Sequence, residues 1–187
     1  MSYIEDYVEK LREFEGEVAW MYLDTEGNVT VARGQMLPNA EAALALPFRS
    51  QASGDLLGEI DVRKDFARVS AMEAGHLPGY YHDYESPVMN EADIEALTLA
   101  RVNDFDISLR RLMPGHAAAP SSAKLANLDM GYNLGLEKLI HKFPHYCSGF
   151  NAGDFRTAAA NCHRIGPNPA RNTWTRLQLL SAAGEAA

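Results

Sequence analysis

The hydrophobic periodicity of the chain changes abruptly at Gly16, and this change constrains the fold more than any other feature. Before this glycine, apolar residues recur at helical spacing: Ile4, Tyr7, Val8, Leu11 and Phe14. We therefore predict an amphipathic helix over residues 2–14. After it, Val18–Leu23 and residues 29–31 are rich in β-branched and aromatic side chains, and Gly27 between them suits a tight turn. The sequence thus predicts a helix that leads directly into a β-hairpin.

Helices dominate the prediction for the rest of the chain. Between the hairpin and residue 90 we expect irregular chain rich in proline and glycine, with two helices at 40–45 and 61–73. Asn90 is a suitable N-cap for a long helix that runs to about Met113. Shorter helices separated by glycine and proline are expected near 120–134, 136–142, 144–150, 153–164 and 168–183.

These elements predict a mainly α fold of the α+β type. A chain of 187 residues is long enough for one domain with a sizeable core. We expect a single domain over residues 1–187, built from the following parts: a helix at 1–13 that packs on the C-terminal lobe, an N-terminal lobe with the hairpin and an insertion at 14–89, an inter-lobe helix at 90–113, and a helical C-terminal lobe at 114–187.

The charge balance argues against a nucleic-acid partner. The chain carries 17 basic and 25 acidic residues, for a formal charge of −8, whereas binding to a phosphate backbone depends on lysine and arginine. No apolar run approaches the roughly 20 residues of a membrane helix. The N-terminus also lacks the basic and apolar regions of a signal peptide. We expect a protein made in the cytoplasm, with no membrane segment.

No pattern for a metal or a cofactor is found in the sequence. The six histidines lack metal-ligand spacing, and we expect them to be surface or capping residues. Cys147 and Cys162 also lack zinc spacing, so two buried thiols and a disulfide both remain open. There is no nucleophile elbow, phosphate-binding loop or dinucleotide fingerprint. We therefore expect chemistry that needs neither a metal nor a cofactor.

Two carboxylates around the hairpin have the chemistry that glycoside hydrolysis requires. One carboxylic acid protonates the leaving oxygen, and one carboxylate acts on water or on the anomeric carbon. Glu15, where the helix meets the hairpin, is expected to be partly buried and to act as the acid, while Asp24 at the turn stays solvated and ionised. Thr30 lies across the hairpin from Asp24, where we expect the two to share a bound water. Spacing alone equally fits an ordinary helix end and hairpin turn.

Several blocks of the chain, taken in order, resemble the phage-type lysozymes, the T-even phage muramidase family of glycoside hydrolases. The segment Glu15-Gly16, Tyr22-Leu23-Asp24-Thr25-Glu26-Gly27 and Thr30 resembles the catalytic segment of that family. Residues 90–105 resemble the start of its inter-lobe helix, and residues 125–135 its central C-terminal helix. Residues 152–161 and 171–176 resemble its last helices. The conserved order of these blocks makes the resemblance specific.

The resemblance implies a lysozyme-like fold and a muramidase activity. Such an enzyme cleaves the β-1,4 bond between N-acetylmuramic acid and N-acetylglucosamine in peptidoglycan by general acid/base catalysis, with inversion and without a cofactor. Glu15 is then the general acid, Asp24 the carboxylate that acts on water, and Thr30 a residue that positions the water. The resemblance also implies glycan contacts at Met36, Tyr132, Asn133, Tyr146 and Asn161.

The chain departs from the phage pattern in two places. After Thr30 the phage proteins usually carry Gly-x-Gly-His, whereas this chain has Ala32-Arg33-Gly34-Gln35. The larger Ala32 and Arg33 are expected to narrow or recharge the floor of the glycan site. The longer segment at 38–89 resembles the bacterial branch of the family, with type VI secretion effector and bacteriocin-like lysozyme domains.

This branch implies cell-wall lysis by an endolysin or an antibacterial toxin that another route delivers to peptidoglycan. It also implies a monomer and a cognate immunity or inhibitor protein as a further partner. Two alternatives stay open. One is a catalytically impaired lysozyme-fold protein that binds glycan without cleaving it, and the other is a toxin or adaptor domain that acts through a protein partner.

Overall fold

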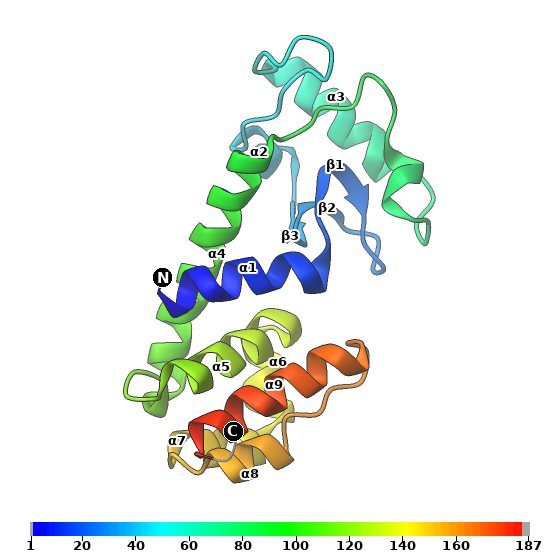
Figure 1. Cartoon of the computed structure of the whole chain (residues 1–187). Coiled ribbons are helices and arrows are strands. Elements are labelled where there is room, and N and C mark those ends of the chain that lie inside the picture. Colours follow the sequence, from blue (N-terminus) through cyan, green and yellow to red (C-terminus); the bar gives the residue numbers. More distant parts are fainter. Residues whose placement is uncertain (1, 185–187) are drawn as a thin grey trace. The chain divides into compact units, whose positions relative to one another are not determined.

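The computed structural model describes residues 2–184, which are mostly helical with one small sheet (Figure 1). The chain divides into two compact units. A sheet-containing unit comprises Leu11–Thr98, and a helical unit comprises Met1–Lys10 together with Leu99–Ala187. The mainly α, α+β class expected from the sequence is confirmed. The boundaries between the units fall within the first helix and within the long helix, not at linkers.

The predicted helix and hairpin are both present. Helix α1 spans Tyr3–Glu15, and Gly16 then adopts a φ of 68°, which lets the chain turn directly into a strand. Strand β1 (Val18–Leu23) pairs antiparallel with β2 (Val29–Ala32). A third strand, β3 (Gln35–Met36), extends the sheet in the order β1-β2-β3 and was not predicted from the sequence.

The register of the sheet puts the hairpin candidates at defined positions. Val18 lies opposite Ala32, whereas Tyr22 lies opposite Thr30, so the pairing shifts between these two points. Such an irregularity bends the strand and increases its twist. On the other side of β2, Thr30 lies opposite Met36.

The insertion contributes three short elements to the sheet-containing unit. Helix α2 spans Ala40–Leu44, and Asn39 caps it by accepting a hydrogen bond from the Ala42 backbone N–H. Helix α3 spans Glu59–Ser70, two residues earlier at its start and three at its end than predicted. A 3-10 turn, η1 (Pro78–Tyr81), lies in the expected loop.

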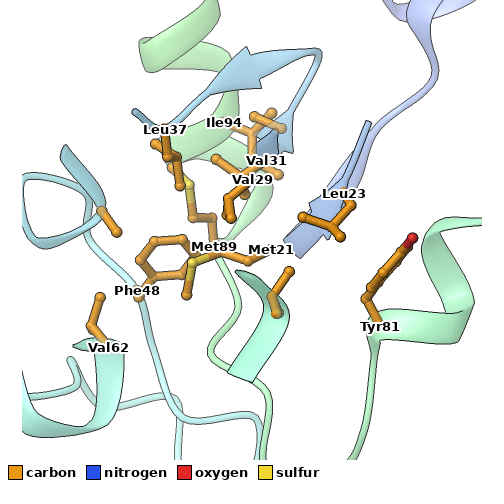
Figure 2. Packing of buried hydrophobic residues seen from close by; sticks show 13 residues of the cluster. Met21, Leu23, Val29, Val31, Leu37, Phe48, Val62, Tyr81, Met89 and Ile94 are labelled. Carbon is orange, nitrogen blue, oxygen red and sulfur yellow. The ribbon is translucent and has the colours of Figure 1, made fainter. Parts of the chain in front are cut away.

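A hydrophobic core holds the hairpin in this unit. Figure 2 shows side chains from the sheet packed against others from α3, η1 and the start of α4. Its members include Met21, Leu23, Val29, Val31, Leu37, Phe48, Val62, Tyr81, Met89 and Ile94. Full burial of one such side chain contributes about 1.5–3 kcal/mol. Burial of these strand residues therefore determines which face of the hairpin packs against the core.

The helical unit follows the predicted order of helices. Its elements after the first helix are α4 (Glu91–Leu112), which begins in the other unit, η2 (Pro114–His116), α5 (Ser121–Leu134), α6 (Leu136–Lys142), α7 (Pro144–Asn151), α8 (Phe155–Ala160) and α9 (Pro169–Ala182). Helix α5 packs on α9, and α7 packs on α8. Helix α8 is shorter than the predicted 153–164, because Asp154 caps its start and the chain leaves helical geometry at Asn161.

A buried charged cluster ties α5 to α9 inside the helical unit. Asp129 Oδ2 accepts from Arg164 Nη2 at 2.7 Å and from Thr175 Oγ1 at 2.6 Å. Asp129 Oδ1 accepts from Arg171 Nε at 2.8 Å. Removal of one partner from such a buried network leaves an uncompensated charge, which typically costs about 3–5 kcal/mol.

Candidate active site

Glu15 stands at the C-terminal end of α1, and its side chain is exposed. The expected partial burial of this residue is therefore wrong. The reason is local, since Gly16 and Glu17 are exposed as well and the chain at this junction runs along the surface.

Asp24 is fixed by the turn that it closes. Its Oδ1 accepts hydrogen bonds from the backbone N–H groups of Glu26 and Asn28, at 2.9 and 2.8 Å. The Asn28 side chain also reaches Oδ2, at 3.2 Å. Gly27 supplies a φ of 82°. The carboxylate is half-buried, so its orientation is set by the backbone rather than by solvent.

Thr30 is almost fully buried on β2, and its hydroxyl donates to the Asn28 carbonyl at 3.1 Å. Asn28 therefore contacts both candidates, Asp24 through its backbone N–H and side chain and Thr30 through its carbonyl. Asn28 is not among the site residues predicted from the sequence. An asparagine that follows the glycine of a hairpin turn was the available signal, because its short amide can bond to local backbone and side chains.

This arrangement has a specific consequence for a bound water. The proton of the Thr30 hydroxyl is used by the Asn28 carbonyl, so its oxygen is available only as an acceptor. The Asp24 carboxylate is also an acceptor. A water that donates to both would keep its own lone pairs free for an electrophile.

The Arg33 side chain, in the turn after Thr30, does not point toward solvent as expected. Arg33 was expected to recharge the floor of the glycan site, but its side chain is only 3% exposed and its Nη2 donates to Glu17 Oε2 at 2.9 Å. Ala32 adopts a φ of 58°, which is the left-handed conformation that glycine favours. Met36, opposite Thr30 on β3, is 46% exposed and available for contact.

The proposed glycan contacts at 132 and 133 lie near the end of α5, in the helical unit. Tyr132 is 8% exposed; its ring packs edge-on to Tyr7, and the Arg101 guanidinium lies 4.6 Å from its centroid. Asn133 is half-buried, and its Oδ1 accepts from Arg164 Nη1 at 3.4 Å. Both residues thus also have packing roles within this unit.

Tyr146 is fully buried in the helical unit, and its hydroxyl donates to Asn127 Oδ1 at 3.0 Å. Burial raises the pKa of this phenol well above its ordinary value. A ring with no exposed surface does not touch a bound glycan, so the expected contact at Tyr146 is corrected to a packing role. Asn161 is half-buried at the end of α8, and its amide donates to the Thr157 carbonyl at 2.8 Å.

A cavity of about 520 Å³ lies in the helical unit. It is bounded by the segment after α8 and the start of α9, with Cys162, His163, Arg164, Asn172 and Arg176 among its lining residues. These residues were not predicted as a group from the sequence. The concave shape depends on how the irregular segment folds back on α9, and no local pattern encodes that.

The helical unit also contains a buried histidine network. His116 Nε2 bonds to Asp106 Oδ1 at 2.8 Å, and His116 Nδ1 bonds to Asn127 Nδ2 at 2.9 Å. Asp106 Oδ1 also accepts from the Tyr3 hydroxyl, and Asp106 Oδ2 from Arg110 Nε, both at 2.6 Å. The expectation that the histidines are surface or capping residues is therefore wrong for His116, which is fully buried.

The remaining features concern cysteines, metals and membranes. Cys147 and Cys162 are free, buried thiols. Within residues 2–184, no group of three or more His, Cys, Asp or Glu side chains is arranged to hold a metal ion. Over the same residues, the helices are all too short or too polar to span a bilayer.

The candidates thus fall into two groups. Glu15, Asp24, Thr30 and Met36 belong to the sheet-containing unit, whereas Tyr132, Asn133, Tyr146 and Asn161 belong to the helical unit. Within the first group, the hairpin brings Asp24, Asn28 and Thr30 into one hydrogen-bonded set. Comparison with known proteins gives no match to any family model or to any curated protein sequence.

Proposed function

We propose that this protein is a muramidase of the phage-type lysozyme kind, which cleaves the β-1,4 bond between N-acetylmuramic acid and N-acetylglucosamine in peptidoglycan. The observation that carries the proposal is the hydrogen-bonded set of Asp24, Asn28 and Thr30. It holds two hydrogen-bond acceptors, the Asp24 carboxylate and the Thr30 hydroxyl oxygen, at the hairpin turn. Along the chain, strand β1 separates this turn from Glu15. The ordered sequence blocks that resemble the family add support.

In the proposed reaction, Glu15 donates its proton to the glycosidic oxygen as the bond to the anomeric carbon breaks. A water then forms the new bond to that carbon and gives a proton to Asp24, which acts as general base. Thr30 accepts the second hydrogen of the water and so orients its lone pair. Because the water attacks from the face opposite the leaving group, the configuration inverts.

Glu15 is exposed in the structure. A glycan that covers it would exclude water from its carboxyl, and exclusion of water favours the protonated form of a carboxylic acid. We propose that substrate binding activates the acid in this way. Met36, Tyr132, Asn133 and Asn161 are the proposed glycan contacts, with Tyr146 as internal support.

By the same resemblance, we propose delivery to the cell wall as an endolysin or as an antibacterial effector of the bacterial branch. An immunity or inhibitor protein is then the expected protein partner. No metal or cofactor is assigned a role, because two carboxyl groups and a water complete the reaction.

The proposal is tested by Glu15→Gln and Asp24→Asn, with release of muropeptides from purified peptidoglycan as the readout. Each variant is expected to lose at least about a hundredfold in activity, because removal of a general acid or base typically costs 10²–10⁴-fold. Glu26→Gln, at the exposed turn, is the matched control and should retain activity. Full activity of Glu15→Gln in a folded protein would overturn the assignment.

One observation favours a second function, glycan binding without cleavage. Glu15 is exposed, and Asp24 Oδ1 is already used by two backbone N–H groups, so a purely structural role for both residues fits the same geometry. Wild-type protein that sediments with peptidoglycan but releases no muropeptides would favour this second function over the first.

A further inference from the structure

A buried carboxylate on α3 has one oxygen without a hydrogen-bond donor. The side chain of Asp65 is 7% exposed, and its Oδ1 accepts from Arg68 Nε at 2.7 Å. Within residues 2–184, the other oxygen, Oδ2, is buried and meets no donor. A buried acceptor in this state is destabilising, and a ligand that donates a hydrogen bond to it would remove the cost.

Arg68 does not serve both oxygens of Asp65, because other acceptors hold its guanidinium. Its Nη2 donates to the Tyr81 carbonyl at 2.8 Å and to Ser86 Oγ at 3.1 Å. Its Nη1 lies 3.7 Å from Asp83 Oδ2. Burial raises the pKa of Asp65, although the hydrogen bond and the charge of Arg68 act in the opposite direction. This one cation therefore compensates the buried carboxylate incompletely.

Asp65 also lines a cavity of about 290 Å³ within the sheet-containing unit. Ligand pockets commonly have volumes of about 300–1,000 Å³, so this cavity suits a small ligand. Leu57 and Pro87 add apolar surface to the lining. The charged lining residues are four acidic ones, Asp61, Asp65, Asp83 and Glu85, and two basic ones, Lys64 and Arg68. The excess of acidic side chains favours a cation.

The lining decides which kind of cation fits. In the described part of the chain, no group of three or more His, Cys, Asp or Glu side chains is arranged to hold a metal ion. An ammonium group instead brings three N–H donors, and a short alkyl stem attached to it would pack against Leu57 and Pro87. We propose that this cavity binds a primary alkylammonium group, which donates a hydrogen bond to Asp65 Oδ2. This site is separate from the muramidase proposal and does not depend on it.

Titration of the full chain with n-butylammonium, followed through the NMR chemical shifts of the backbone amides, tests this binding. Shifts are expected at Leu57, Asp61 and Glu85, whereas n-butanol, the uncharged analogue, should leave them unchanged. Asp65→Asn keeps the size of the side chain and removes its charge, so it should weaken binding at least about tenfold. Asp55→Asn is the matched control, because Asp55 is exposed and lies outside the lining, and it should bind like the wild type.

A capped tripeptide with a lysine between two alanines distinguishes the two sources of an ammonium group. Tighter binding of this peptide than of n-butylammonium at the same residues assigns the site to a lysine side chain of a peptide, and the reverse order assigns it to a small free amine. If Asp65→Asn does not fold, Asp61→Asn combined with Glu85→Gln, at exposed positions of the lining, takes its place and should weaken binding severalfold.

Three results would overturn the proposal. The first is wild-type affinity in whichever of these variants is folded. The second is a set of shifts with n-butanol equal to those with n-butylammonium. The third is a wild-type protein that shows no shifts at Leu57, Asp61 and Glu85 with either ammonium ligand.

Discussion

At the scale of single residues, the turn after Thr30 holds a non-glycine residue in a left-handed backbone conformation. Ala32 has a φ of 58°, a conformation that a glycine adopts without strain. A non-glycine residue pays about 1–2 kcal/mol for this conformation. The turn therefore holds an alanine in a conformation that glycine adopts more readily.

This strain predicts an unusual response to substitution by glycine. Ala32→Gly should leave the free energy of unfolding unchanged or raise it by up to about 1 kcal/mol, because relief of strain offsets the greater freedom of the unfolded chain. Ala45→Gly is the control at a φ of −73°, and it should lower stability by about 0.5–1 kcal/mol. Urea unfolding of both variants measures the difference.

Gly34 provides the reverse test in the same turn. Its φ is 78°, and a Cβ built there would meet nothing within 4 Å. Gly34→Ala should therefore lose about 1 kcal/mol from backbone strain alone, without a steric clash. Unchanged stability of Gly34→Ala would contradict the left-handed conformation of this turn.

At the scale of elements, the hairpin depends on the core beneath it. Met21 on β1 is fully buried among side chains from β2, the insertion and α4 (Figure 2). Met21→Ala should lower the free energy of unfolding by about 2–5 kcal/mol, because it leaves a cavity in a packed site. Tyr84→Ala, at a side chain that is 83% exposed, should change stability by less than about 0.5 kcal/mol. Chemical denaturation of the two variants compares them directly.

The elements predicted well from the sequence are those whose conformation is determined by residues within the element itself. Helix α1, the hairpin and the long helix α4 follow from periodicity and from capping or turn residues that lie within the segment itself. Strand β3 was missed because it has two residues, and its pairing depends on the left-handed turn at Ala32. A period of two needs a longer segment to be recognised.

The candidate site was predicted less completely, because burial depends on distant parts of the chain. The hairpin position of Asp24 and Thr30 followed from the turn sequence. The burial of Tyr146 follows instead from tertiary packing. The burial of Arg33 in an ion pair with Glu17 follows from the strand register. The exposure of Glu15 likewise depends on which segments cover the junction.

At the scale of the whole molecule, the buried His116 network makes stability depend on pH. Burial lowers the pKa of His116. The Tyr3 hydroxyl is affected as well, since burial and its hydrogen bond to Asp106 raise its pKa to about 12. Asp106 would have a raised pKa from burial alone, but hydrogen bonds from Tyr3, His116 and Arg110 lower it. Neutral His116 accepts a hydrogen bond at Nδ1 from the Asn127 amide. A proton on Nδ1 would make this nitrogen a donor that faces the N–H donor of Asn127, and the hydrogen bond would be lost.

The lowered pKa fixes the sign of the pH effect. The unfolded chain binds a proton to this histidine near pH 6.5, before the folded protein does. The contribution of His116 is therefore fully present above about pH 6.5 and is lost as the pH falls through the lower folded pKa. The stability difference between wild type and His116→Gln should shrink on acidification, measured by urea unfolding at several pH values. Leu77→Ala, at an exposed side chain that does not ionise, should show no such trend.

We propose that water, activated at Asp24 and Thr30, cleaves the glycan. Mass spectrometry of the soluble fragments from purified peptidoglycan tests this most directly, because the reducing end records what attacked the anomeric carbon. Attack by water predicts fragments that end in hydrated N-acetylmuramic acid for the wild type, with no fragments for Glu15→Gln. Anhydro ends, lighter by one water, would contradict attack by water, and a wild type that releases no fragments would contradict hydrolysis altogether.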